Sequence, residues 1–436
     1  MMIQGGSGPP YATKDLVLVG GGHSHVGVLK MLAMARQGKP SLASLALSRT
    51  RVTLVAKQIH TPYSGMLPGY VAGHYDHDAC HIDLAPLARL AGATLVHASA
   101  TGLDLERRLV HIRSESPSSI ADRPPVAYDV LSIDVGITPD MSSVPGARDH
   151  TTAVKPIDAF VRRVDGLLSE GPDAGATSVA VIGGGAGGIE LTLALHHRLS
   201  VTQGRPCTFT LFTRSSLLQG SSAAAQRRFR SLLRRRNVRV VEWAAVTRVD
   251  AGRLHYRIRR ASSPGEGAAE GKEGEDASAT FDHCLWCTSA AAMPWLASSG
   301  LATDDRGFVV VNTHLQSTSH AHVFAAGDCA TIAGHPRPKA GVFAVRQGAP
   351  LMQNLTRALL GGGNATPSPS PSFPISSPPP LVTYVPQSTY LSLVSTGDCR
   401  AVGLWGPLAF EGEWVWRLKH WIDTNWMAKY TTDVRR

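Results

Sequence analysis

Cysteine is scarce in this chain of 436 residues: the six present are scattered, without the dense pairing of a disulfide-stapled secreted domain. No apolar run approaches the roughly 18 to 20 residues needed to cross a bilayer. Residues 1–14 lack both the apolar segment of a secretion signal and the arginines of an organellar transit peptide. We therefore expect a reducing compartment and a location that is cytoplasmic or peripheral to a membrane.

Acidic residues are fewer than basic ones, and the formal net charge is +10. Much of the excess lies in the arginine-rich segment 227–239, where Phe229, Leu232 and Leu233 recur at helical spacing. This pattern predicts a helix with one buried face and one solvated arginine face. Because no recognition motif accompanies the charge, we expect no nucleic-acid partner.

Two patterns rich in metal-ligand residues lack a second ligand group. Cys284 and Cys287 form a CxxC inside a predicted strand, and the run 74–81 holds three histidines with two aspartates. Zinc sites and activated dithiols need a further ligand pair or a helix N-terminus, respectively. We therefore expect neither a redox dithiol nor a metal site.

Two glycine-rich turns each stand between an apolar run and a helix-like segment. The first reads GGGHSH over residues 20–25, and the second reads GGGAGGIE over residues 183–190. Glycines let a pyrophosphate approach the backbone, and the free N–H groups of the following helix favour its negative charge. One such turn is weak evidence, but two indicate two dinucleotides, commonly a nicotinamide and a flavin that exchange electrons.

A third motif, the apolar segment 323–330, ends its strand in Gly327-Asp328. It resembles the late segment of two-dinucleotide flavoproteins, in which the aspartate holds the ribityl chain of FAD. The order of the three motifs predicts an α/β fold with two Rossmann-like domains, in which an NAD(P) domain interrupts the FAD domain.

The expected domain boundaries follow from this order. Residues 14–150 and 285–360 form the two parts of the FAD-binding domain, residues 151–284 form the NAD(P)H-binding domain, and residues 381–436 form a C-terminal module. Within the first unit, a helix over 23–36 and a strand over 51–56 flank an expanded loop.

Two segments are poor in large apolar residues. Residues 261–280 are rich in Gly, Glu, Ala and Ser, and residues 361–380 are rich in Ser and Pro. Such compositions bury too little apolar surface to offset their ordering entropy. We predict a disordered insertion and a linker, respectively.

Several motifs together resemble one family. The first glycine turn, HTPYSGMLPG at 60–69, VKPID at 154–158 and PKAGVFAVRQG at 338–348 resemble the pyridine nucleotide-disulfide oxidoreductase-like flavoproteins. The likeness is greatest to the branch found N-terminal to selenophosphate synthetase, which is itself similar to type II NADH:quinone dehydrogenases. The 436 residues themselves contain no segment that resembles the synthetase, so we expect a form that is not fused to it.

The resemblance implies FAD as cofactor and NADH or NADPH as substrate. The FAD-binding residues are expected to be Gly20, Gly21, Gly22, His23, His25, Thr61, Pro62, Gly65 and Asp328. The NAD(P)H-binding residues are expected to be Gly183, Gly185, Gly188, Glu190 and Arg214. Lys339 and Gln347 are expected to be catalytic, because Gln347 falls where type II dehydrogenases carry a glutamine near the quinone end of the flavin.

The chain departs from the usual fingerprints at three places. His25 replaces the third glycine of the first turn, and we favour a packing role over contact with the cofactor. The strand 51–55 ends without the acid expected for the ribose hydroxyls. The strand 209–212 ends in Thr213 and Arg214, and an arginine there can pair with a 2′-phosphate, which leaves NADPH open.

The expected chemistry excludes a dithiol relay, because the segment after the first unit lacks the CxxxxC of disulfide reductases. A quinone or another small electron acceptor is the leading alternative. Two other interpretations stay open: a reductase of sulfur or selenium species, and a slow redox-sensing protein similar to apoptosis-inducing factor.

Five of the eight tryptophans lie after residue 400. Trp414, Leu418, Trp421 and Ile422 share one face of a predicted helix, with cationic residues beside them. This composition is typical of an interfacial amphipathic helix that lies on a membrane. The alternative is a helix that packs on the FAD domain or on the second subunit of a homodimer.

Overall fold

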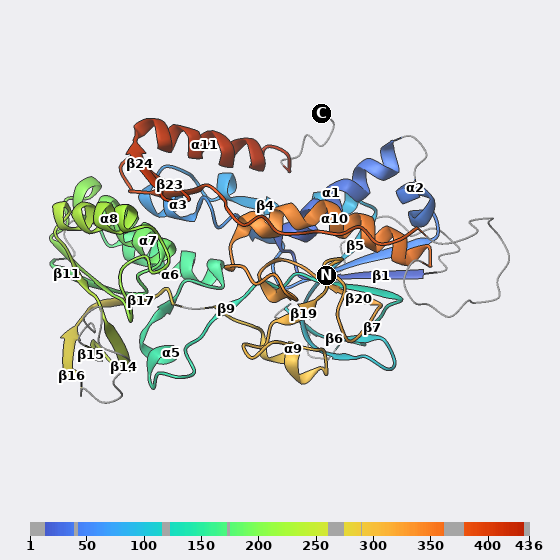
Figure 1. Ribbon diagram of the computed structural model, residues 1–436, viewed down its shortest axis with the longest axis horizontal. Coiled ribbons are helices and arrows are strands. Elements are labelled where there is room, and N and C mark those ends of the chain that lie inside the picture. Colours follow the sequence, from blue (N-terminus) through green and yellow to red (C-terminus); the bar gives the residue numbers. More distant parts are fainter. Residues whose placement is uncertain are drawn as a thin grey trace.

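The computed structural model describes residues 14–38, 42–115, 123–171, 175–259, 274–288, 290–361 and 379–430. Two sheets built mainly from parallel strands organise these residues, one in each half of the molecule (Figure 1). Helices cover both sheets, so the expected α/β class with two Rossmann-type units is confirmed.

The first sheet contains the strands of the expected FAD domain. Its order is β20 (Val323–Ala325), β8 (Val130–Ile133), β1 (Lys14–Val19), β2 (Thr50–Ala56), β5 (Ala93–Asp104), β6 (Leu109–Ser114) and β7 (Val126–Ala127). The first five strands are parallel, and β6 and β7 add antiparallel pairs at one edge. The central strands β1, β2 and β8 are almost wholly buried, as expected for parallel strands inside a covered sheet.

The second sheet belongs to the expected NAD(P)H domain. Its order is β10 (Thr152–Ala153), β17 (His283–Trp286), β11 (Thr177–Ile182), β12 (Cys207–Phe212) and β13 (Val238–Val241). All its pairs are parallel. Because β17 belongs to this sheet through Trp286, the expected domain boundary at 284–285 falls inside a strand.

The helices connect these strands. They are α1 (His23–Gln37), α2 (Leu42–Leu47), α3 (Leu67–Ala72), α4 (Leu84–Leu90), α5 (Ala147–His150), α6 (Ile157–Ser169), α7 (Ala186–His196), α8 (Ala223–Arg235), α9 (Pro294–Ser298), α10 (Gly341–Leu359) and α11 (Glu413–Met427). In α8, Phe229, Leu232 and Leu233 are buried, and Ser222 caps the helix by accepting a bond from the N–H of Ala225. The helix predicted from the arginine-rich segment is therefore confirmed.

Short sheets complete the chain. They are β3 (His60–Pro62) with β4 (His81–Asp83), β9 (Thr138–Pro139) with β18 (Ala290–Ala291), β19 (Val309–Val311) with β21 (Ala330–Ile332), β14 (Ala244–Asp250) with β15 (Arg253–Ile258) and β16 (Glu275–Thr280), and β22 (Ser392–Ser395) with β23 (Ala401–Trp405) and β24 (Leu408–Gly412). Single turns at Asp78–Cys80 (η1) and Gly327–Cys329 (η4) and a π-helical turn at His197–Thr202 (η3) lie between them.

Two predictions about loops need correction. The segment expected to be an expanded loop contains α2, in which Ala46 and Leu47 are buried in the core of the FAD domain. The segment expected to be a disordered insertion ends in β16, which pairs with β15 and so gains a full ladder of hydrogen bonds. Residues 260–273 and 362–378, which hold the rest of the two low-complexity segments, lie outside the described residues.

The C-terminal module lies across the two halves. Its sheet β22–β24 contacts α7 and α8 of the NAD(P)H unit, while α11 packs on that sheet and reaches η1 of the FAD unit. Figure 1 shows α11 above α3 and β23, along the top of the molecule. This position brings the last helix over the loop that follows β3.

Candidate functional site

Three strands of the first sheet end side by side and place three motifs together. Val19 of β1 lies beside Ile133 of β8, which in turn lies beside Ala325 of β20. The residues that follow these strands are the first glycine turn, Asp134 and the Gly327-Asp328 turn. Ligands of open parallel sheets bind at this carboxyl edge, so the sheet itself assembles the candidate site.

The first glycine turn cannot tolerate side chains. Gly20 has φ +98°, and a Cβ there would lie 2.2 Å from the carbonyl oxygen of Asp134. A Cβ at Gly21 would lie 2.5 Å from the side chain of Leu84, and one at Gly22 would lie 2.3 Å from the carboxylate of Asp134. The glycines predicted as FAD-binding are therefore required by the protein's own packing as well.

Asp134 is a site residue that the sequence analysis missed. Its side chain is 2% exposed, and Oδ2 accepts hydrogen bonds from the backbone N–H groups of Ser24 at 2.9 Å and His25 at 3.2 Å. Burial, together with the charge of Asp328, raises its pKa to about 7, against those hydrogen bonds. The available signal was a carboxyl residue placed directly after the buried strand VLSI.

Both ring nitrogens of His25 form hydrogen bonds within the protein. Nδ1 donates to the carbonyl oxygen of Gly20 at 2.7 Å, and Nε2 accepts from the hydroxyl of Ser132 at 2.8 Å. A carbonyl can only accept, so the proton lies on Nδ1. Burial lowers the pKa of His25 to about 4, so the ring is neutral. These contacts favour packing over contact with a cofactor.

His23, by contrast, has a free polar atom in the site. Its ring lies edge-on to Tyr63 and Trp426, with centroids 5.4 and 5.1 Å away. Nε2 is buried and has no hydrogen-bond partner among the described residues. Burial lowers the pKa of His23 to about 4, although the charge of Asp328 opposes the shift. A buried ring nitrogen without a partner is suited to a polar ligand.

Asp328, the aspartate expected on the ribityl chain, forms an ion pair with Lys155. Their Oδ2 and Nζ atoms are 3.1 Å apart, and the Asp328 side chain is 15% exposed. Lys155 lies between β10 of the second sheet and α6, and it was not predicted as a site residue. A charged lysine therefore stands at the carboxylate that a ribityl chain would approach.

Lys339 and Gln347 line one cavity with Asp328, of about 110 Å³. Lys339 Nζ donates to the carbonyl oxygen of Ala330 at 2.6 Å and lies 3.9 Å above the ring of Phe308. Gln347 Oε1 accepts from the N–H of Gly327 at 2.6 Å. Both side chains expected to be catalytic are thus used to hold the Gly-Asp turn and its neighbouring strand.

The loop after β3 covers the first glycine turn. Thr61 donates its hydroxyl to the carbonyl oxygen of Gly21 at 2.8 Å, and Pro62 lies beside it in β3, paired with His81. The carbonyl oxygen of Gly65 accepts from Lys419 at 2.6 Å. The three residues expected near the flavin ring therefore lie between the first glycine turn and α11.

The second glycine turn also has backbone positions that only glycine can occupy, but its surface is more open. Gly183 has φ +129°, and a Cβ at Gly188 would lie 1.9 Å from the carbonyl oxygen of Gly183. A Cβ at Gly185 meets nothing within 4 Å. Arg214 follows β12 at the same sheet edge and is exposed. The space over Gly185 is where a pyrophosphate would lie against the N-terminus of α7.

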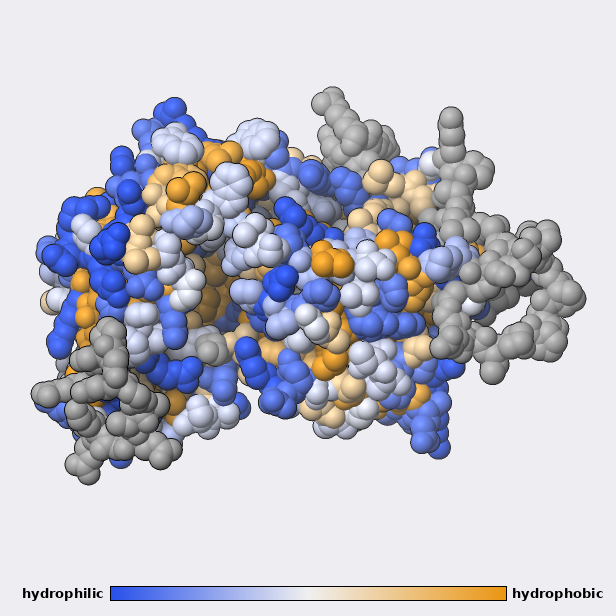
Figure 2. Space-filling model, viewed as in Figure 1, coloured by the Kyte–Doolittle hydropathy of each residue, from blue (hydrophilic) through white to orange (hydrophobic). Residues whose placement is uncertain are grey.

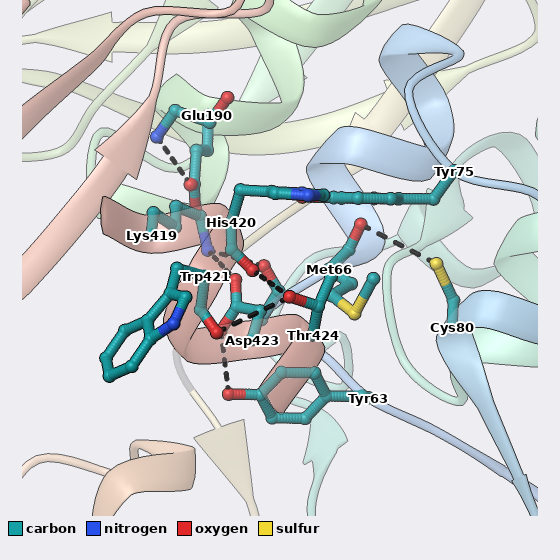
Figure 3. Close-up of polar contacts among 12 residues, drawn as sticks. Tyr63, Met66, Tyr75, Cys80, Glu190, Lys419, His420, Trp421, Asp423 and Thr424 are labelled. Atoms are coloured by element: carbon teal, nitrogen blue, oxygen red, sulfur yellow. Dashed lines mark hydrogen bonds and ion pairs between the residues drawn. The ribbon is translucent and has the colours of Figure 1, made fainter. Parts of the chain in front are cut away.

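Glu190 faces the C-terminal module rather than the open side of the second turn. It is partly buried and accepts from the N–H of Ser395 at 2.6 Å (Figure 3). Burial raises its pKa to about 7, while the charge of Lys419 opposes the shift. Glu190, predicted as a cofactor-binding residue, therefore lies in a network of protein groups.

That network continues through α11 to the loop after β3. Lys419 Nζ contacts Asp423 Oδ2 at 2.8 Å, and the hydroxyl of Tyr63 donates to Asp423 Oδ1 at 3.0 Å. Burial disfavours the charge of Lys419, but Glu190 and Asp423 outweigh it and raise its pKa. Lys419 was not predicted as a site residue; its i,i+4 spacing from Asp423 was the available signal for this pair.

The cysteines of the CxxC are both free. Burial raises the pKa of Cys284 to about 12 and that of Cys287 further still, so both are neutral thiols. Within the described ranges, no group of three or more His, Cys, Asp or Glu side chains has the geometry to hold a metal ion.

The C-terminal module exposes large apolar side chains. Trp414 and Trp421 on α11 are 57% and 64% exposed, and Trp405 and Leu408 at the tip of the β23–β24 hairpin are similarly exposed. In Figure 2 pale and orange groups gather at the upper left, where Figure 1 places α11 and β24. No helix among the described residues is long and apolar enough to cross a membrane.

Comparisons with known proteins agree with this geometry. A model of the family described as pyridine nucleotide-disulphide oxidoreductase matches residues 14–348. The chain is 22% identical over 365 residues to the NADH dehydrogenase-like protein YutJ of Bacillus subtilis, which covers 83% of this chain and 87% of that protein. It is 24% identical over 240 residues to the demethylphylloquinone reductase NdbB of Synechocystis, covering 55% of this chain and 54% of that protein.

Among solved structures, that of NDH2 from Plasmodium falciparum in complex with NADH superposes with a TM-score of 0.71. The two chains are 13% identical, and the match covers 97% of this chain and 99% of the other. At this identity the likeness is one of fold, and it extends through the C-terminal module.

Proposed function

This chain belongs to the pyridine nucleotide-disulphide oxidoreductase family, and from that premise we propose that it oxidises NAD(P)H through bound FAD and delivers the electrons to a quinone. The family membership makes it an FAD-dependent NAD(P)H oxidoreductase. The finer parts of the proposal are the positions of the two dinucleotides and the identity of the acceptor.

One observation carries the proposal: each of the two parallel sheets ends in a glycine turn that opens a helix. The first turn shares its edge with Asp328 and with the partnerless nitrogen of His23. These groups fit FAD, whose ribityl hydroxyls and phosphates supply donors and acceptors. The second turn has open space over Gly185, which fits the pyrophosphate of a dinucleotide substrate.

In this proposal the first glycine turn, Thr61 and Asp328 hold FAD, and the second turn holds NAD(P)H. FAD, when bound, supplies the chemistry of hydride acceptance and onward electron transfer. The chain's own residues orient the two dinucleotides and exclude water between them. Arg214 is proposed to pair with a 2′-phosphate, because no acid follows β12 to favour the ribose hydroxyls of NADH.

The network of Glu190, Lys419 and Asp423 is proposed to release and take up protons near the flavin ring. Glu190 carries a proton over part of the neutral range because burial raises its pKa to about 7. Lys419 stands between that carboxyl and the carbonyl oxygen of Gly65, in the loop that would line the ring. A reduced quinone takes up two protons, and Glu190 is placed to exchange one with this region.

A quinone is favoured as acceptor for two reasons. A relative is named as a demethylphylloquinone reductase, and this chain has no CxxxxC with which to reduce a disulfide. The exposed tryptophans of α11 and of the β23–β24 hairpin would let the protein lie on a membrane that contains the quinone.

Anaerobic stopped-flow reduction of the purified yellow protein tests the proposal. NADH or NADPH should bleach the flavin within seconds, and a quinone analogue should restore the colour at a comparable rate. A flavin that bleaches over minutes and recovers slowly with quinone would favour the redox-sensing interpretation. Fast recovery with selenite or polysulfide, but not with quinone, would favour the sulfur or selenium reductase.

A further inference from the structure

The N-terminus of α1 already binds a carboxyl side chain of the protein, that of Asp134. Four N–H groups lie free at the start of any helix. Here Gly22 N donates to the carbonyl oxygen of Asp134 at 3.2 Å, and Ser24 N and His25 N donate to its Oδ2 at 2.9 and 3.2 Å. The start of α7 differs, because a Cβ added at Gly185 or Gly187 meets nothing within 4 Å. Of the two glycine turns, the first is therefore the one whose helix N–H groups already bind a carboxyl group of the protein.

Asp134 fills the gap between the two turns that are expected to hold FAD. A Cβ at Gly22 would lie 2.3 Å from its carboxylate, and a Cβ at Gly327 would lie 2.3 Å from its Oδ1. Gln347 holds Gly327 in place, because its side-chain oxygen accepts a hydrogen bond from the backbone N–H of Gly327. The carboxyl group thus lies between the two glycine turns, and Asp134 is only 2% exposed.

A pyrophosphate at this turn would bring two negative charges next to the carboxyl group. An ionised Asp134 would repel them strongly, because little water separates the groups. A protonated Asp134 would not, and its O–H could donate a hydrogen bond. Since Oδ2 already accepts two N–H groups, the proton would lie on Oδ1.

We propose that Asp134 recognises FAD as a neutral acid, so that FAD binds the protonated form and binding takes up one proton from solvent at neutral pH. This inference rests on the proposed function, in which FAD occupies the first glycine turn. The step forms the O–H bond of Asp134 and breaks none in FAD. It makes Asp134 a ligand-recognition residue rather than a packing residue.

The other charged or titratable groups near Asp134 do not replace it in this role. They are His23 and His25 on α1, Asp328 and Cys329 on η4, and Lys155 and Lys339 beyond them. Burial lowers the pKa of both histidines to about 4 and raises that of Cys329 to about 12, so all three stay neutral from pH 6 to 9. Asp328 is held as an ion pair with Lys155. Burial lowers the pKa of Lys339, which is therefore the one competitor the test must separate.

The test measures FAD affinity against pH. The flavin-loaded protein is diluted at pH 5.5 to 9, and the released FAD is measured by its fluorescence. The dissociation constant should be flat at acidic pH and then rise by up to about tenfold per pH unit above neutrality. Calorimetry in buffers of different ionisation enthalpy should show uptake approaching one proton per FAD at pH 8.

The isosteric variant Asp134→Asn keeps the acceptor for Ser24 and His25 but cannot ionise. Its FAD affinity should not vary with pH, and at pH 8.5 it should bind at least as tightly as the natural protein. The control Asp129→Asn, directly before β8 where Asp134 directly follows it, should keep the natural slope. If Asp134→Asn fails to fold, proton uptake by the natural protein decides the matter.

The outcomes separate two failures. Stoichiometric FAD with a pH-independent dissociation constant would overturn the role of Asp134 and leave the proposed function intact. A slope that persists in Asp134→Asn would also overturn it and would point to Lys339. A natural protein that holds no FAD at any pH would instead contradict the proposed function itself.

Discussion

The hydroxyl of Tyr63 donates a hydrogen bond to the carboxylate of Asp423, 360 residues away in the sequence, at 3.0 Å. The Tyr63 ring also stacks on Trp426, with centroids 4.4 Å apart. Because Tyr63 lies in the loop that covers the first glycine turn, α11 fixes the geometry of a loop in the FAD unit. The C-terminal helix is therefore part of the candidate site.

Replacing Asp328 with asparagine should release most of the flavin. The change removes the negative charge that would strengthen bonds to the ribityl hydroxyls and leaves Lys155 without its partner. A loss of about 1.5 to 3 kcal/mol, or roughly ten- to a hundredfold in affinity, is expected for charged hydrogen bonds. The ratio of flavin to protein absorbance after gel filtration measures it. The control Asp305→Asn, at an exposed aspartate, should keep full flavin.

Gly185→Val should block NAD(P)H while leaving FAD in place. The valine meets no protein atom within 4 Å at its Cβ, so folding should be unaffected and the bulk should fall where the pyrophosphate lies. Stopped-flow bleaching by NADH should slow by at least about a hundredfold in proportion to lost binding. Gly166→Val, in α6 with equally open surroundings, is the control. Normal bleaching in Gly185→Val would place the substrate elsewhere.

Arg214→Ala tests the preference between the two nicotinamides. If Arg214 pairs with the 2′-phosphate, the loss should fall on NADPH and leave NADH nearly unchanged. Arg239→Ala, which removes an exposed arginine from β13, supplies the comparison. A ratio of kcat/KM values for NADPH and NADH equal to the natural one would remove Arg214 from the site.

Lys419→Met should shift the pH dependence of turnover toward higher pH. Lys419 holds down the pKa of Glu190, which burial otherwise raises to about 7, so its loss raises that pKa further. The rate of quinone reduction is measured from pH 5.5 to 9, and the apparent pKa of this profile should be higher in the variant than in the natural protein. Lys429→Met, on the exposed end of the same region, should leave the profile in place.

Glu190 should also make the unfolding free energy depend on pH. Its folded pKa of about 7 lies above the ordinary glutamate value of 4.5, so its contribution is greatest below pH 4.5 and declines as pH rises to about 7. The full span is about 3 kcal/mol at most. Urea unfolding from pH 4.5 to 7.5 should show a flatter profile in Glu190→Gln. The exposed Glu413→Gln should retain the natural slope.

Surface changes on α11 test membrane contact better than truncation, because Trp426 and Met427 of that helix are buried in the core. Trp421→Ser with Ile422→Ser should weaken flotation with anionic vesicles, and added salt should weaken it further. Met34→Ser, at an exposed apolar residue elsewhere, is the control. Equal flotation of both variants would argue against docking through this face.

The sequence pattern predicts those parts of the site that depend on local backbone geometry. A dinucleotide-binding glycine turn directly follows an apolar strand, so Gly20 and Gly183 could be located from the sequence pattern. Asp134 and Lys419 could not, because their importance arises from neighbours far away in the chain. Asp134 gains its role when β8 pairs with β1, and Lys419 gains its role when α11 reaches Gly65.

Failures in the loops have a similar origin. Residues 275–280 have little apolar content, and the order of β16 comes from its ladder with β15 rather than from its own side chains. Likewise, Lys419 can be buried because the carboxyl groups of Asp423 and Glu190 offset the cost of removing its charge from water. That cost cannot be judged from the residue type without these neighbours.

The contact between Tyr63 and Asp423 can form only late in translation, because the two residues are far apart in the sequence. A ribosome that has just made Tyr63 must add 360 more residues before its partner exists. At bacterial to eukaryotic rates of about 5 to 20 residues per second, that interval is roughly 20 to 70 s. During this time the nascent FAD unit can pair its strands, but the loop over the first glycine turn has no α11 to hold it. Nascent chains that stall before residue 413 should therefore emerge colourless and protease-sensitive at this loop.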